Sequence, residues 1–289
     1  MLYLLLSILF STSLVIILRL FERWKIDTRY GIVFNYLVCV ITGLTAMEDI
    51  AQLQQIATWN GWAACLLLGV GFILIFNLIG KSTQLLGVAT TSIAFKLSFI
   101  IPVIVAVLFY GDQLTFFKIA GIAAAIAAVY FITYQKEATT EKNKLQKGLA
   151  WLPVLIFVGS CITDSCFNYI QRHLTPPGFD HIVTVMVFLG AFLSGMVMYG
   201  RNKELYSLRN IAGGIVLGVP NYGSLYFLLK ALQESPFPPS TLFPVNNLGI
   251  VCVAAFVGLL FFRESVNRRK IIGFVLAVSS IVLIGFLDR

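Results

Sequence analysis

Ten long apolar segments run through the chain, and they restrict its fold more than any other feature. They cover residues 2–19, 31–47, 61–80, 86–110, 114–134, 149–171, 181–200, 208–231, 237–262 and 268–287. A helix needs about 20 mostly apolar residues to cross the hydrocarbon core of a bilayer. The segments are continuous apolar runs rather than alternating ones, so their backbone polar groups must be satisfied within helices. The sequence predicts an all-α integral membrane protein with ten transmembrane helices.

Composition argues against a soluble protein. The chain is 58% hydrophobic and 12% charged, whereas an ordinary soluble domain is about 25% charged. The net charge of +8 would suggest a nucleic-acid ligand in a soluble protein, but basic residues also collect in the cytoplasmic loops of membrane proteins. The five cysteines lie inside apolar stretches without metal-ligand spacing. We therefore expect a lipid bilayer and a small-molecule substrate as partners, with no nucleic acid, metal or cofactor.

The basic residues gather in every second connection between the segments. They are Arg19, Arg23, Lys25 and Arg29 after the first, Lys81 after the third, Lys136, Lys142, Lys144 and Lys147 after the fifth, Arg201, Lys203 and Arg209 after the seventh, and Arg263, Arg268, Arg269 and Lys270 after the ninth. Because cytoplasmic loops carry an excess of Lys and Arg, these connections are predicted to be cytoplasmic. We expect a multi-pass protein of a bacterial cytoplasmic (inner) membrane, with both termini outside.

The chain repeats itself with an offset of 152 residues, the separation of Asp112 and Glu264. In each copy an acidic residue is followed six residues later by a lysine and nine residues later by a glycine. The motif is Asp112, Lys118 and Gly121 in the first copy and Glu264, Lys270 and Gly273 in the second. The repeat predicts two units, residues 1–135 and 149–289. Five helices per unit is an odd number, so the second unit must be inverted in the membrane relative to the first.

Several polar residues are predicted to lie near the middle of the membrane, from their positions along the segments at about 1.5 Å per residue. They are Lys96, Asp164, Asn246, Asn247, Asn221, Tyr222, Tyr226, Asn168 and Thr12. A polar or charged side chain at this depth is costly, so it usually faces the interior of the bundle and has a function. These residues are the candidate substrate-binding site. No catalytic residue and no metal ligand is predicted.

The chemistry of these side chains leaves alternatives open. Lys96 suits the carboxylate or phosphate of a substrate, and the alternative is a stabilising pair with Asp164. Asp164 suits an amine, a transferable proton or a fixed counter-ion role. Asn246 and Asn247 suit hydrogen bonding to the polar part of a substrate, and Tyr222 suits an aromatic wall. The alternative for the two asparagines is repair of the helix after Pro244.

Prolines and small residues suggest where helices bend and approach one another. Pro102, Pro220 and Pro244 are predicted hinges, because proline interrupts the backbone hydrogen bonds of a helix. Gly214 and Gly218 share a stripe with the two tyrosines, which indicates either a wet surface or close packing. The small residues of the fifth and tenth segments favour helix packing within a monomer, with a homodimer face as the alternative. Asn35 and Asn77 are expected near the membrane interface.

The ends of the two units resemble the carboxy-terminal signature of the repeat in the drug/metabolite transporter superfamily, specifically its EamA-like ten-helix branch. The resemblance is carried by the acid, lysine and glycine motif described above, followed by a small-residue helix. It implies two inverted five-helix repeats around a central cavity, alternating access without ATP, and substrates such as amino acids or related metabolites. The position that corresponds to Pro102 in the second copy is occupied by Ala254, so the second copy lacks this proline.

The leading functional expectation is a secondary transporter of a small polar metabolite, amino acid-like or anionic. A flippase for lipid-linked carriers is the alternative, and it would need a cavity that opens sideways to lipid. An intramembrane enzyme has less support, because His173 and His181 have no neighbouring nucleophile or metal-ligand spacing.

Overall fold

The computed structural model describes residues 2–47, 56, 59–99, 115–133, 149, 151–176, 180–234, 239–263 and 267–283. Within these residues there are ten α-helices and no strand. They are α1 (Leu2–Arg23), α2 (Thr28–Thr45), α3 (Trp62–Leu86), α4 (Val88–Lys96), α6 (Phe116–Thr133), α8 (Trp151–Tyr169), α9 (Asp180–Tyr199), α10 (Leu208–Glu234), α11 (Pro239–Leu260) and α12 (Arg268–Val282). Three short turns are η2 (Leu97–Phe99), η3 (Ile170–Leu174) and η4 (Lys203–Tyr206). The predicted all-helical fold is confirmed.

The predicted segments and the observed helices agree in order. In the predicted segment 86–110 the described residues end at Phe99, and they form α4 (Val88–Lys96) and the turn η2 (Leu97–Phe99). The hinge residue Pro102, the motif residue Asp112 and most of the connection between the two units lie outside the described residues. Glu264 of the second copy lies outside them as well.

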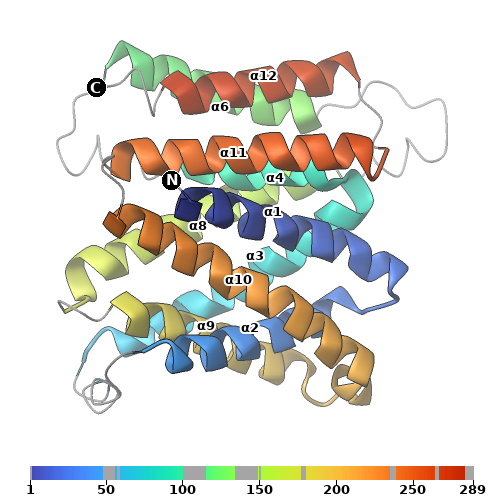
Figure 1. Cartoon of the computed structure of the whole chain (residues 1–289), viewed down its shortest axis with the longest axis vertical. Coiled ribbons are helices and arrows are strands. Elements are labelled where there is room, and N and C mark those ends of the chain that lie inside the picture. Colours follow the sequence, from blue (N-terminus) through green and yellow to red (C-terminus); the bar gives the residue numbers. More distant parts are fainter. Residues whose placement is uncertain are drawn as a thin grey trace.

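The ten helices form two rows of five (Figure 1). Contacts between neighbours give the order α12, α11, α1, α10 and α2 for the first row, and α6, α4, α8, α3 and α9 for the second. The rows are joined at their two ends by the pairs α6–α12 and α2–α9, and between these ends by α4–α11 and α1–α3. Each row contains helices from both halves of the chain, so the halves are interleaved rather than side by side.

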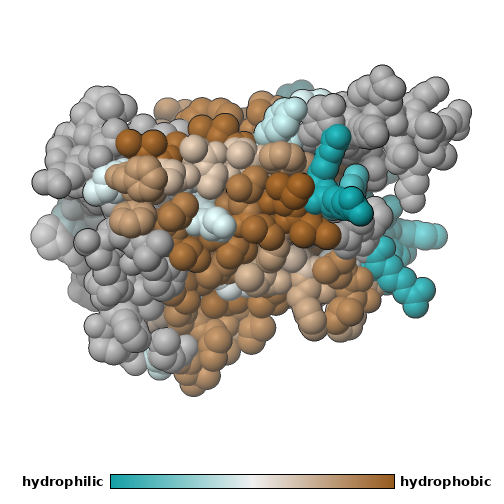
Figure 2. Space-filling view, turned by 90° about the horizontal axis from the view of Figure 1, so that it is seen from above, coloured by the Kyte–Doolittle hydropathy of each residue, from teal (hydrophilic) through white to brown (hydrophobic). Residues whose placement is uncertain are grey.

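The surface is suited to lipid. Four helices are long and apolar enough to cross a membrane, namely Leu2–Arg23, Trp62–Leu86, Ile182–Tyr199 and Leu208–Leu228. Figure 2 shows a broad apolar face with hydrophilic residues at one end. Large apolar side chains are exposed along the helices, including Phe116, Val197 and Leu208. The protein is therefore a multi-pass membrane protein.

Three connections with exposed basic residues lie at one end of the bundle, together with the α3–α4 turn. The α1–α2, α3–α4, α9–α10 and α11–α12 connections are all at the right in Figure 1. Their exposed residues include Arg23, Lys25, Arg201 and Arg263. We call this end the basic end. The α3–α4 connection is a single residue, Gly87, whose φ of 101° is a conformation that other residues rarely adopt.

In two helix pairs, glycines allow the backbones of the two helices to come into direct contact. A Cβ at Gly69 of α3 would lie 2.4 Å from the backbone N of Ala191 in α9, and a Cβ at Gly190 would lie 2.4 Å from the carbonyl O of Leu66. The pair α2–α10 is built in the same way, because Gly214 and Gly218 meet the backbone of α2. The stripe that carries these two glycines therefore packs closely on a neighbour.

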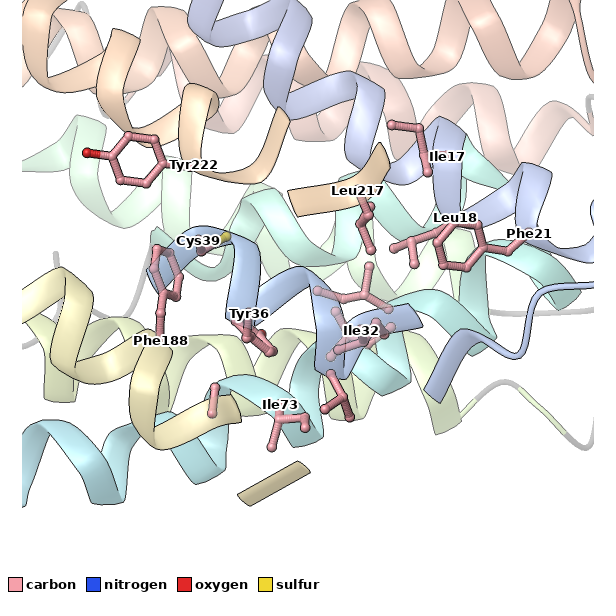
Figure 3. Packing of buried hydrophobic residues seen from close by; sticks show 14 of the residues in the cluster. Ile17, Leu18, Phe21, Ile32, Tyr36, Cys39, Ile73, Phe188, Leu217 and Tyr222 are labelled. Atoms are coloured by element: carbon pink, nitrogen blue, oxygen red, sulfur yellow. The ribbon is translucent and has the colours of Figure 1, made fainter. Parts of the chain in front are cut away.

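Apolar side chains from both rows fill the space around α2. Figure 3 shows Leu18 and Phe21 of α1, Ile32 and Tyr36 of α2, and Leu217 of α10 packed together. The Tyr36 hydroxyl donates to the carbonyl O of Phe72 at 3.1 Å, which satisfies its one polar group inside this core. This core holds the α2–α9 end of the rows together.

Candidate functional site

The candidate site begins where α4 ends. The α-helix stops at Lys96, and a 3₁₀ turn, η2, continues from Leu97 to Phe99. A 3₁₀ stretch within a predicted longer helix often marks a functional or strained position. Helix α4 contacts α1, α3, α6, α8, α11 and α12, so it is a central element of the bundle. The end of α4 near mid-bundle can be followed in Figure 1.

The Lys96 ammonium is held by its own helix. Its Nζ lies 4.6 Å from the centroid of the Phe95 ring, within the range of a cation–π contact. A cation at the carboxyl end of a helix is also favoured by the helix dipole. The Lys96 side chain is half-buried rather than sealed. The amine is thus positioned inside the bundle, against the Phe95 ring.

Asp164 of α8 is fixed by a residue two positions after Lys96. The Ser98 hydroxyl donates to Oδ2 of Asp164 at 2.6 Å. The Cys161 thiol, one turn earlier on α8, donates to the carbonyl O of Ser98 at 3.5 Å. Lys96 and Asp164 attract each other electrostatically, but within the described part of the chain no ion pair of 4.0 Å or less joins them. An amine and a carboxylate therefore lie near each other without direct contact.

Asn246 of α11 lies at the depth of Lys96. The antiparallel neighbours α4 and α11 share a contact cluster through Val88 and Ala254. Eight residues further along α4 is Lys96, and eight residues back along α11 is Asn246. Asn246 is 3% exposed and its Oδ1 has no hydrogen-bond partner. Asn247 is half-buried. A buried carboxamide oxygen without a partner is costly, so it is available for a ligand or a water.

Asn221 has a protein partner that the sequence analysis did not anticipate. Its Nδ2 donates to Oδ1 of Asn35 at 3.1 Å, and the Cys39 thiol donates to the carbonyl O of Gly218 at 3.6 Å. Asn35 is fully buried between helices and does not face the surface of the protein. Asn221 directly follows Pro220, which is inside α10 and removes one backbone hydrogen bond there. Asn221 thus contributes to the α2–α10 contact.

The two tyrosines lie together on α10. The rings of Tyr222 and Tyr226 are stacked with centroids 6.4 Å apart and planes 22° apart. Tyr222 is 8% exposed and belongs to the apolar core around α2 (Figure 3), where it lies against Gly43. Tyr226 packs against the same core and remains half-buried. The structure places this pair on a different helix row from Lys96.

Unpartnered oxygens are concentrated on the helices that surround Lys96. Many hydroxyls in the structure bond to a carbonyl one turn earlier, as Thr42, Thr83 and Thr163 do. Others do not. Buried oxygens without a partner are Thr12 Oγ1 on α1, Asn77 Oδ1 on α3, Ser92 Oγ on α4, Ser160 Oγ and Ser165 Oγ on α8, and Asn246 Oδ1 on α11. These five helices therefore carry hydrogen-bonding capacity that the protein itself does not use.

The remaining predicted residues are only partly described. Asn168 lies in α8 and Pro244 lies in α11, but their side chains lie outside the description. Cys39, Cys65 and Cys161 are buried thiols that form no disulfide, and within the described residues no group of three or more His, Cys, Asp or Glu could hold a metal ion. Ser98 was not predicted. Its position two residues from Lys96 in a predicted membrane segment is the signal that could have suggested it.

No known family model matches the chain. The sequence is 23% identical over 296 residues to a protein of Haemophilus influenzae that is described only as an uncharacterized protein. The alignment spans 98% of this chain and 97% of the relative. The similarity thus extends over the whole ten-helix chain, and the relative is bacterial.

Proposed function

We propose that the protein is a secondary transporter that moves a small polar metabolite, amino acid-like or anionic, across a bacterial cytoplasmic membrane by alternating access. One observation carries the proposal: Lys96, Ser98 and Asp164 are brought together at the end of α4, among central helices of a membrane protein. Charged groups in this position are costly and usually mark a substrate or ion pathway. We assign the chain no enzymatic activity.

The division of the fold into two rows supports an inverted repeat. The 152-residue offset relates α1, α2, α3, α4 and α6 to α8, α9, α10, α11 and α12. Applied to the first row, in the order α12, α11, α1, α10 and α2, it yields α6, α4, α8, α3 and α9, which is the order of the second row. A pseudo-twofold axis between the rows explains this match. Transporters built from such repeats bind substrate near mid-membrane at the repeat interface.

Each residue of the site has a role in this proposal. Lys96 binds a carboxylate or phosphate, and Asp164, oriented by Ser98, takes an amine or a proton. Asn246 and Asn247, at the same depth, complete the site with carboxamide hydrogen bonds. Because Lys96 and Asp164 are neighbours without direct contact, a substrate with both charges could bind between them. The site is consistent with EamA-like membership of the drug/metabolite transporter superfamily, which is part of the proposal.

The basic end supplies the proposed orientation. If it faces the cytoplasm, as the excess of Lys and Arg favours, both termini lie outside. We propose a monomer as the working unit, because the small residues Ala125, Ala128, Gly273 and Ala277 are buried, and the Ser280 hydroxyl donates to the carbonyl O of Gly121 at 2.7 Å. These contacts use the small-residue faces of α6 and α12 within one chain.

The proposal is tested by a ligand search followed by flux. A thermal-shift screen of the purified protein against pools of small metabolites finds a ligand, because a ligand of the folded state raises the unfolding temperature. Uptake of that ligand is then measured in proteoliposomes for wild type, Lys96→Gln and Lys81→Gln. Lys81 is an exposed lysine on α3 and serves as the matched control. Flux that survives Lys96→Gln unchanged, or conversion of the ligand to a new compound, contradicts the proposal.

A further inference from the structure

At the basic end, the α1–α2 hairpin is fastened to the end of α3. Nε2 of Gln84 donates to Oγ1 of Thr28 at 2.7 Å and to the carbonyl O of Leu18 at 3.1 Å. NH1 of Arg19 donates to the carbonyl O of Thr83 at 3.2 Å. We call this set of contacts the α1–α3 seam. It joins the first row to the second row at the basic end.

The two halves of the chain differ at this seam. The 152-residue offset relates α1 and α3 to α8 and α10. Helix α1 packs against α3, whereas the described parts of α8 and α10 make no comparable contact. Other related pairs do match, since α2–α10 and α3–α9 are both extensive contacts built on glycines. The α1–α3 pair is thus one of several pairs, with α2–α3 and α1–α4, whose counterparts in the described part of the other half make no comparable contact.

Unpartnered oxygens lie directly behind the seam. Asn77 precedes the seam residue Gln84 by seven positions on α3, about 10 Å at 1.5 Å per residue, and Thr12 precedes Leu18 by six positions on α1, about 9 Å. Ser92 lies one turn before Lys96 on α4. Each of the three polar residues has a buried oxygen without a partner, which costs about 1–3 kcal/mol in a closed protein. Water would satisfy all three if the seam opened.

We propose that the α1–α3 seam is the gate at the basic end of the carrier, that it is closed in this structure, and that Thr12, Asn77 and Ser92 line the path behind it when it opens. This inference rests on the proposed transport function. Gln84 is the central residue of the gate, because one carboxamide bonds to both the backbone of α1 and the side chain of Thr28. The closed gate separates Lys96 and Asp164 from the basic end.

Cysteine labelling tests the gate without a known substrate. Ser92→Cys is introduced into the full chain in membrane vesicles, a membrane-impermeant methanethiosulfonate is applied at the basic end, and the peptide containing residue 92 is quantified by mass spectrometry. The readout is specific to that peptide, so the natural cysteines can stay. We expect the rate to rise at least tenfold when Arg19→Gln and Gln84→Ala are added. Lys81→Ala, an exposed change on the same helix turn, should leave the rate unchanged.

A disulfide lock gives the opposite test. A Cβ at Gly80 would lie 2.4 Å from Cγ2 of Thr28, so Thr28→Cys with Gly80→Cys places two thiols within bonding reach. Oxidation should stop labelling at position 92, and reduction should restore it. The gate is refuted if the oxidised protein is still labelled, or if the seam variants label no faster while their unfolding temperature equals that of the control. Gated labelling without flux would count against the transport function and not against the gate.

Discussion

The hydroxyl of Ser98 donates to Oδ2 of Asp164 across 2.6 Å, between the turn that follows α4 and the second half of α8. This bond joins two helices that are adjacent in the second row and 66 positions apart in the chain. It fixes one oxygen of the carboxylate and leaves the other available. A substrate amine or a proton would bind at a group whose orientation is already set.

Ser98→Ala should weaken ligand binding. A hydrogen bond to a charged group contributes about 1.5–3 kcal/mol, which corresponds to a loss in affinity of about tenfold to a hundredfold. Ser98→Thr keeps the hydroxyl and should bind close to wild type. Ligand titration by thermal shift or calorimetry measures this difference. Equal affinity for Ser98→Ala and wild type would show that the bond does not orient Asp164 for binding.

Lys96 and Asp164 should show coupled stability. Lys96→Gln leaves the carboxylate of Asp164 without its neighbouring positive charge, and Asp164→Asn leaves the amine without its counter-ion, so each should be destabilising by about 1–3 kcal/mol. The double variant removes both charges and should recover part of the loss. Thermal unfolding of the four proteins in detergent gives the coupling energy. Strictly additive effects would mean that the two groups do not interact.

Asn35 should be a stability residue rather than a transport residue. Asn35→Leu removes the acceptor of the Asn221 carboxamide inside the bundle, which should cost about 1–3 kcal/mol. The variant Asn35→Leu with Asn221→Leu leaves no unpartnered amide and should be more stable than Asn35→Leu alone. The unfolding temperatures of Asn35→Leu, Asn221→Leu and the double variant test this order of stability. A double variant that is less stable than both single variants would exclude this explanation.

Gly69→Ala should separate α3 from α9. The added methyl would lie 2.4 Å from the backbone N of Ala191, and backbone cannot move aside as a side chain does. Overpacking of this kind costs about 1–3 kcal/mol. Gly71→Ala is the matched control, since its methyl would meet one atom, Cγ2 of Thr163, at 2.9 Å, and should cost less. A comparison of unfolding temperatures tests the order of the two variants.

Asp27 should make the α1–α2 hairpin sensitive to acid. Burial opposes ionisation of its carboxylate, but hydrogen bonds and the positive charge of Arg29 outweigh burial and hold the pKa of Asp27 below its usual 3.8. A group with a lowered pKa in the folded state stabilises the protein above the usual pKa and loses this contribution as pH falls through the folded value. Asp27→Asn should therefore reduce stability at neutral pH and flatten its loss below about pH 4. Unfolding temperatures between pH 3 and pH 7 test this, and parallel curves would refute it.

Much of the fold could be predicted because membrane insertion depends on local composition. Ten apolar segments require helices, since backbone groups have no other partners in lipid. Lys96 could also be selected from the sequence, because a charged side chain inside a membrane-spanning segment is costly and usually has a function. Asn35 shows the limit of this logic. Counting residues from the end of a segment gives its depth but not its neighbours, and contact with α10 buries it completely.

The sequence by itself determined the helices, their order, the 152-residue repeat and the basic character of alternate connections, because each of these depends on residues close together in the chain or on simple counting. The tertiary structure decided which helices are neighbours, and with them the bond between Ser98 and Asp164, the partner of Asn221 and the fastening of Gln84 to Thr28. Side-chain contacts between distant segments depend on the rotation and register of packed helices, and these follow from interlocking shapes such as the glycine contacts of α3 with α9. Local sequence patterns predict the apolar faces of the helices but not the register in which the helices pack.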